Sequence, residues 1–151
     1  MYDAFFVTAT AAISSVRPPE IERRERLLGV SMPTDRIIWA TGSNGKVIRS
    51  DDAGQQWAAQ LAPTVENLQG IAAWSANQAV GVGGNGVVIR TDDSGKTWQE
   101  VPVPKSDVAN KLLSVRAYDK GVAWAVGELG AVLKTRYFGA SWERALPGKD
   151  Q

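Results

Sequence analysis

The chain has 151 residues, 17 of them basic and 16 acidic, which gives a formal net charge of +1. Such a length is typical of a single domain, and the balanced charge creates no field that would attract nucleic acid or an anionic membrane. Because cysteine and histidine are both absent, disulfides, thiolate metal sites, cysteine nucleophiles and ordinary serine triads are excluded. Any hydrolytic chemistry would have to rest on carboxylates, tyrosine or lysine. We expect no catalytic residue, no metal site and no cofactor.

Residues 1–26 are the least regular part of the chain. Residues 4–13 are apolar enough for a signal-peptide core, but Asp3 precedes them and no basic residue does, so no clear signal peptide is predicted. Thr8 fits the hydroxyl position of the repeat described below. An N-terminal arm and a worn half repeat are therefore the two interpretations of residues 1–26. No apolar run reaches the roughly 18 residues that a membrane helix needs.

Three repeats follow, and their starts at Leu27, Leu68 and Leu112 are 41 and 44 residues apart. Short runs rich in β-branched residues alternate with glycine turns, which predicts strands. The clearest repeat predicts four strands, at residues 68–73, 78–82, 87–91 and 97–103. Four short antiparallel strands per repeat of this length describe one blade of a β-propeller. The predicted fold is thus all-β, with an N-terminal arm or half blade at 1–26 and blades at 27–67, 68–111 and 112–151.

Each repeat ends in a polar turn followed by a tryptophan, in the pattern Ser/Thr-x-Asp-x-Gly-x-x-Trp. The motif positions are Ser50, Asp52, Gly54 and Trp57, then Thr91, Asp93, Gly95 and Trp98, and finally Thr135, Gly139 and Trp142. In the third copy Tyr137 replaces the acid. We expect the carboxylate to accept hydrogen bonds from amides two or three residues on, the glycine to adopt positive φ, and the tryptophan to pack between sheets.

These turns are predicted to stabilise the fold and not to bind a metal or catalyse a reaction. Adjacent strand residues such as Asp92 and Asp93 point to opposite faces, and no third ligand is in register. We expect Trp98→Ala to cost about 3–5 kcal/mol, as for a large core aromatic, and Asp93→Ala to cost less. The third turn, which lacks the acid, should be the loosest.

The complete motifs, together with residues 123–127 (Ala-Trp-Ala-Val-Gly) and 130–135, resemble the photosystem II stability and assembly factor family of Asp-box (BNR) propellers and its bacterial relatives. The resemblance implies a non-enzymatic scaffold in the thylakoid lumen or periplasm that holds protein partners while a membrane complex is assembled. It also implies an arginine patch for partner contact. From clustering and repeat position, the candidates are Arg23, Arg24, Arg26, Arg49 and Arg90.

Three blades form an incomplete ring, since propellers typically have four to eight blades. Either the chain is a piece of a longer propeller, or another chain, such as a second copy in a homo-oligomer, completes the ring. A permanent extrinsic subunit of a larger complex is an alternative function. A sugar-binding or glycosidase-like propeller is another, although Glu66, Glu100, Glu128 and Glu143 show no pattern of paired catalytic carboxylates.

Overall fold

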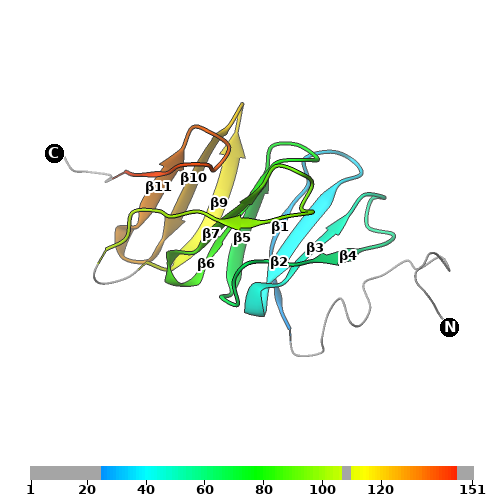
Figure 1. Cartoon of the computed structure of the whole chain (residues 1–151), viewed down its shortest axis with the longest axis horizontal. Coiled ribbons are helices and arrows are strands. Elements are labelled where there is room, and N and C mark those ends of the chain that lie inside the picture. The colour runs from blue at the N-terminus through cyan, green and yellow to red at the C-terminus, as the bar shows by residue number, and fades with distance from the viewer. Residues whose placement is uncertain (1–24, 107–109, 146–151) are drawn as a thin grey trace.

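The computed structural model describes residues 25–106 and 110–145. Within this part of the chain, the strands form three four-stranded antiparallel sheets, which confirms the predicted all-β class with three propeller-type blades (Figure 1). The arm or half blade predicted at residues 1–26 lies outside the described residues apart from its last two positions. Arg23 and Arg24 therefore have no described position.

Each sheet consists of four strands that are consecutive in the chain, so every connection within a sheet is a hairpin. Blade 1 contains β1 (Leu27–Ser31), β2 (Ile38–Gly42), β3 (Val47–Ser50) and β4 (Ala58–Gln60). Blade 2 contains β5 (Leu68–Ala73), β6 (Ala79–Gly83), β7 (Val88–Thr91) and β8 (Gln99–Glu100). Blade 3 contains β9 (Leu112–Tyr118), β10 (Val122–Gly127), β11 (Val132–Thr135) and β12 (Glu143–Arg144).

The fourth strand of blade 2 is shorter than the sequence predicts. In blade 2 the expected strand at residues 97–103 is reduced to β8, followed by one further backbone hydrogen bond from Val101 N to Val88 O. Pro102 and Pro104 follow directly, and proline has no amide hydrogen to continue the ladder. The prediction was therefore wrong in length because the apolar pattern continues past the residues that can pair.

The core of the protein lies between the blades. One buried cluster joins blades 1 and 2 and contains Trp39, Val47, Leu68, Ile71, Ala79, Val87, Ile89 and Trp98. The other joins blades 2 and 3 and includes Val80, Val82, Val88, Leu112, Val115, Ala123, Ala125, Leu133 and Trp142. Figure 1 shows blade 2 (green) between blade 1 (cyan) and blade 3 (yellow to orange). The apolar face of one blade is thus buried by the next.

Blade 2 is buried on both of its faces, which explains the sequence of its third strand. Val88 belongs to the cluster with blade 3 and its neighbour Ile89 to the cluster with blade 1, and both are fully buried. Successive side chains of a strand point to opposite faces. A continuous apolar run is therefore required here in place of an alternating one.

Glycine at the end of the second strand of each blade is required by a close backbone contact. A Cβ at Gly83 would collide with the carbonyl oxygen of Asn67, the residue that precedes β5. The same oxygen accepts a hydrogen bond of 3.0 Å from Gly84 N. Gly42 and Gly127 have the same relation to Arg26 and Lys111. This glycine column therefore anchors the innermost strand of each blade to the adjacent hairpin.

Candidate protein-binding surfaces

The second Asp-box turn is held by a chain of short polar contacts. The hydroxyl Oγ1 of Thr91 donates to Asp93 Oδ1 at 2.8 Å and accepts from Gly95 N at 2.9 Å. The Asp93 carboxylate also accepts from the amide and the hydroxyl of Thr97, at 3.0 and 2.6 Å. These bonds, with the Thr97 hydroxyl contributing most, lower the pKa of Asp93 to about 2. The carboxylate is therefore a hydrogen-bond acceptor that stays ionised near neutral pH.

The first turn repeats this geometry. Ser50 Oγ donates to Asp52 Oδ1 and accepts from Gly54 N, each at 2.8 Å. Asp52 Oδ1 accepts from Gln56 N at 2.8 Å, and that bond is the largest cause of the lowered pKa of Asp52. In both turns the amide bound by the acid lies four residues on. The expected spacing of two or three residues was wrong for these hydrogen bonds. The amide two residues after the acid donates to the motif hydroxyl, and the amide three residues after it donates to the backbone carbonyl of the acid.

Positive φ occurs at two consecutive residues in each turn. Gly54, Gly95 and Gly139 have φ of +90°, +82° and +82°, as predicted for the motif glycine. The preceding residues Ala53, Ser94 and Phe138 also have positive φ, between 57° and 66°. These side chains tolerate the left-handed conformation because the hydroxyl-capped turn fixes the backbone around them.

The third turn keeps the hydroxyl and glycine contacts without the acid. Thr135 Oγ1 accepts from Gly139 N at 3.0 Å and from Tyr137 N at 3.2 Å. Phe138 packs edge-on against Trp74 of blade 2, with ring centroids 5.3 Å apart. An aromatic contact to the neighbouring blade therefore accompanies the loss of the carboxylate. Whether this turn is the loosest of the three stays a prediction.

The three motif tryptophans are not equally buried. Trp98 is 6% exposed and Trp142 is 9% exposed, and each packs against the preceding blade as predicted. Trp57 is only half-buried. Its packing between two sheets stays a prediction, because the half blade expected to precede blade 1 lies outside the described residues.

Two of the candidate arginines lie at the blade interfaces. The guanidinium of Arg49 lies 4.9 Å from the ring centroid of Trp39, and its Nη2 donates to Ala76 O of blade 2 at 2.9 Å. Arg90 Nε donates to Phe138 O of blade 3 at 3.1 Å. Both side chains are half-buried. They therefore link neighbouring blades, and their role in binding a partner stays a prediction.

Arg26 is separate from these two residues. Its side chain is exposed just before β1, while its amide donates to Ser43 Oγ at 2.9 Å. The three described candidates thus do not converge on one patch. A different basic residue, Arg116 of β9, is exposed and lines a groove that sequence reasoning did not find. The sequence contains a signal for this residue, because Arg116 is a cation at a repeat position where the other two repeats have Ser31 and Ala72.

The groove runs along the innermost strands of the three blades. Its volume is about 490 Å³, and it is lined by residues 28–31, 69–73 and 113–117. Exposed Val30 contributes an apolar surface and Arg116 a positive charge. Three strands from three different sheets thus form one open surface. This surface offers both apolar and charged groups to a chain segment that contains polar and apolar side chains.

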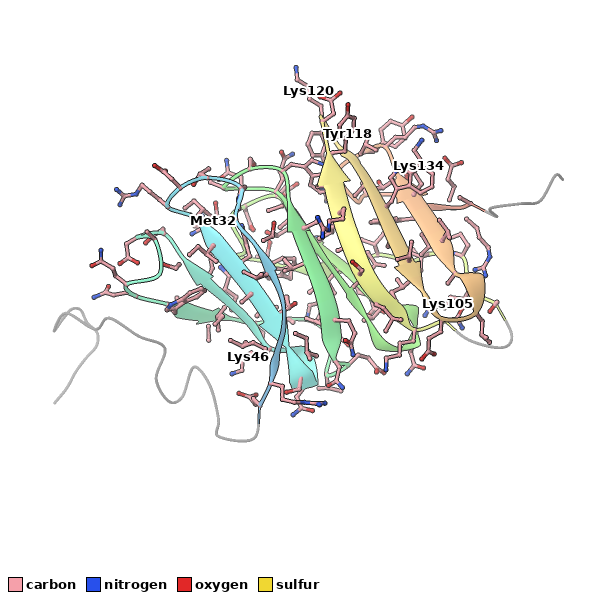
Figure 2. All side chains as sticks on the ribbon, turned by 180° about the vertical axis from the view of Figure 1, so that it is seen from behind. Met32, Lys46, Lys105, Tyr118, Lys120 and Lys134 are labelled. Carbon is pink, nitrogen blue, oxygen red and sulfur yellow. The ribbon has the colours of Figure 1, made fainter. Side chains whose placement is uncertain are left out.

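A second surface is the side of blade 3 that faces away from blade 2. Trp124 of β10 is 43% exposed, and Lys134 Nζ of β11 lies 4.9 Å from its ring centroid. Figure 2 shows Lys134 on β11, at the end of the array farthest from blade 1. Val126 on the same strand is exposed as well. Trp124 was noted in the sequence for the family resemblance, but not as a surface residue.

Two of the four glutamates considered for glycosidase chemistry line the same pocket. Glu66 and Glu128 line one shallow pocket with Asn67, Asn85 and Lys111, and Glu66 Oε2 accepts from Asn85 Nδ2 at 2.7 Å. Glu143 instead pairs with Arg136. Within residues 25–106 and 110–145, no group of three potential metal ligands is found. In the same residues no helix is long and apolar enough to cross a membrane.

Three solved structures with a similar fold have low sequence identity to this chain. YCF48 from Cyanidioschyzon merolae has a TM-score of 0.68 and 22% identity, over 89% of this chain and 40% of that chain. YCF48 bound to D1 peptide has a TM-score of 0.67 and 21% identity, over 78% of this chain and 40% of that chain. An ancestral GH74 enzyme has a TM-score of 0.64 and 18% identity, over 83% and 19% of the two chains. These similarities show the propeller fold alone.

The sequence also matches a family model. The matched residues are 56–149, and the family is described as photosynthesis system II assembly factor YCF48. The chain spans about 40% of the length of the solved YCF48 structures. A comparison with curated proteins finds no match. Since the family model covers more than half of the sequence, this chain belongs to the photosynthesis system II assembly factor YCF48 family of Asp-box β-propellers.

Proposed function

We propose that the chain is a non-enzymatic scaffold that binds a protein subunit of a photosynthetic-type membrane complex during its assembly. The observation that carries the proposal is the open groove along β1, β5 and β9, in a chain of this family. An extended segment can pack apolar side chains near Val30 and direct a carboxylate to Arg116. Hydrogen bonds between arginine and a carboxylate are among the stronger polar contacts in proteins.

The kind of partner is suggested by one solved relative, a YCF48 bound to D1 peptide. By analogy, the partner of this chain would be a segment of a membrane-complex subunit that is exposed on the lumenal or periplasmic side. We propose that the protein acts in that compartment. Neither nucleic acid nor the lipid bilayer is the expected partner, because the net charge is only +1.

The test is a binding titration with the D1 peptide of that complex, labelled with a fluorophore and followed by anisotropy. Arg116→Ala should weaken binding by about tenfold, as expected for the loss of a hydrogen bond between charged groups. Lys96→Ala is the matched control, because Lys96 is an exposed cation outside the groove. No binding by the wild type, or equal losses in the two variants, would contradict the proposal.

The arginine candidates can be tested in the same titration. We propose that Arg26, with Arg23 and Arg24 before it, adds long-range attraction for an acidic partner. Replacing all three by alanine should then weaken binding most at low salt, because exposed charges are screened at high ionic strength. Arg49 and Arg90 should affect binding mainly through the packing of the blades that they link.

A permanent extrinsic subunit differs from an assembly factor in how long the partner stays. An affinity-tagged chain should release an assembly partner in high salt, whereas a permanent complex would keep its partner in stoichiometric amount.

The shallow pocket that contains Glu66 and Glu128 favours a second candidate, a sugar-binding or glycosidase-like propeller. Hydrolysis of any member of a panel of aryl glycosides, lost in Glu66→Gln and Glu128→Gln, would support that alternative.

A further inference from the structure

The innermost strands of the three blades share a β-bulge at the same repeat position. The bulged residues are Leu28, Gln69 and Leu113, each of which is skipped between two paired residues of its own hairpin. A bulge leaves its extra residue outside the ladder, and bulges are frequent beside functional sites, where they redirect a side chain. All three bulged residues line the groove along β1, β5 and β9.

Close backbone contacts hold the three bulges in a fixed relation to one another. A Cβ at Gly29, the residue after the first bulge, would lie 3.0 Å from the Cα of Gly70, the residue after the second bulge. A Cβ at Gly70 would in turn lie 3.3 Å from the Cα of Ser114, the residue after the third bulge. Neighbouring innermost strands are therefore in direct contact beside the bulges. The bulged residues thus form one row across the groove, with one member from each blade.

Gln69 is the polar member of this row, between two leucines. The fold does not require a polar side chain at this repeat position, because Leu28 and Leu113 occupy it in the other two blades. The side chain of Gln69 is half-buried, and within residues 25–106 and 110–145 it takes part in no hydrogen bond. A glutamine amide offers two N–H donors and a carbonyl acceptor. Gln69 therefore brings hydrogen-bonding capacity to the groove that the fold itself does not use.

The two leucines provide apolar surface on both sides of Gln69. Leu113 is 43% exposed and Leu28 is half-buried, so an apolar side chain that packs on them removes further apolar area from water. A main-chain peptide group has one N–H donor and one C=O acceptor, which complement the glutamine amide. The row therefore matches an extended segment that has apolar side chains on both sides of a main-chain peptide group.

We propose that the row of Leu28, Gln69 and Leu113 determines which segment the groove binds. The leucines contact apolar side chains of the partner segment, and Gln69 forms hydrogen bonds with a main-chain peptide group between them. This inference rests on the proposed function, because it specifies what the groove recognises in its partner. Arg116 is not a member of the row, so the two contacts can be removed separately.

The first test is the titration of the D1 peptide with Gln69→Leu. This variant has leucine at all three positions of the row, so it should keep the far-ultraviolet circular dichroism of the wild type. Its dissociation constant should rise about fivefold, as for the loss of a hydrogen bond between uncharged groups. Gln99→Leu is the matched control and should bind like the wild type, because Gln99 is exposed on β8 outside the groove. Equal dissociation constants for Gln69→Leu and the wild type would overturn this inference alone, whereas a wild type that does not bind would overturn the proposed function with it.

The second test identifies the group that Gln69 contacts. D1 peptides are prepared in which each main-chain amide in turn is replaced by an ester, which removes the N–H donor and weakens the carbonyl as an acceptor. One of these esters should weaken binding to the wild type about fivefold and leave binding to Gln69→Leu unchanged. If every ester has the same effect on both proteins, Gln69 does not contact the main chain and the inference is wrong.

The third test concerns the apolar contacts. Leu113→Ala should raise the dissociation constant of the D1 peptide about tenfold, as expected when about two methylene groups lose their contact. Leu61→Ala is the control and should bind like the wild type, because Leu61 is 90% exposed and does not line the groove. Equal dissociation constants for these two variants would show that the leucines of the row do not contact the segment, and the inference would be overturned.

Discussion

The indole Nε1 of Trp98 donates a hydrogen bond of 2.9 Å to the side-chain Oε1 of Gln60 in the preceding blade. Gln60 Nε2 in turn donates to Ser94 O at 3.0 Å, so one glutamine joins two groups of the next turn. Trp142 instead donates to Gly139 O of its own turn. The position equivalent to Gln60 in blade 2 is Val101, which has no side-chain acceptor. The residue at this position therefore decides whether the tryptophan is bonded across the interface.

Removing this acceptor should destabilise the contact between blades 1 and 2. Gln60→Ala leaves a part-buried indole N–H without its partner, and such losses typically cost about 1–3 kcal/mol. The measurement is urea unfolding followed by tryptophan fluorescence. Gln55→Ala is the control, because Gln55 is exposed. Equal unfolding midpoints for the two variants would show that the hydrogen bond contributes nothing measurable.

The motif tryptophans should differ in their contribution to stability according to burial. Trp98→Ala should lower the free energy of unfolding by about 3–5 kcal/mol, as for other large core aromatics. Trp57→Ala should cost clearly less, because Trp57 is half-buried. Circular dichroism in a denaturant titration gives both values. Equal and negligible losses would contradict the structural role of the motif.

Stability should depend on pH through Asp93. Its pKa is lowered to about 2 in the folded protein, below the value of about 3.9 expected in an unfolded chain. The stabilisation is therefore fully present above about pH 4 and is lost as pH falls toward about 2. The unfolding midpoints of the wild type and Asp93→Asn should differ at pH 6 and converge near pH 2. A difference that is independent of pH would exclude this contribution.

The third Asp-box turn should exchange its amide hydrogens fastest. Gln56 N and Thr97 N donate to the motif carboxylates, whereas Ser141 occupies the equivalent position in a turn where Tyr137 replaces the acid. Hydrogen exchange measured by NMR should show the least protection at Ser141. The packing of Phe138 on Trp74 opposes this trend. The best protection at Ser141 would mean that the aromatic contact outweighs the missing carboxylate.

Arg49 should contribute to the thermal stability of the fold. Its guanidinium covers Trp39 and bonds Ala76 O of the next blade, so Arg49→Ala should lower the Tm by several degrees, as for a loss of 1–2 kcal/mol. Arg49→Lys should restore only part of the loss, because an ammonium lacks the planar fork of arginine. Arg36→Ala, an exposed control, should leave the Tm unchanged. Differential scanning calorimetry distinguishes these outcomes.

The repeat pattern in the sequence predicted the elements of the fold well. The first strand of blade 2 has the predicted bounds, Leu68 to Ala73, and the motif glycines have the predicted positive φ. These features depend on local chemistry, namely short apolar runs, turn residues and glycine, which a single repeat contains in full. The shortened fourth strand is the exception, because its apolar residues continue beyond the prolines that end pairing.

The candidate surfaces were predicted less well because they depend on which blade lies next to which. Arg49 and Arg90 look like surface charges in the sequence, yet each bonds to a carbonyl of the following blade. Trp124 looks like a strand core residue, yet nothing in the described part of the chain covers it fully. Comparing equivalent positions across the repeats would have identified Trp124 and Arg116, but only once the direction of stacking was known.

The bonds that complete each interface join residues far apart in the chain, 38 positions for Gln60 with Trp98 and 48 for Arg90 with Phe138. The interface of a blade is therefore completed by residues near the end of the following repeat. We expect the apolar face of each blade to stay exposed during synthesis until the following repeat has left the ribosome.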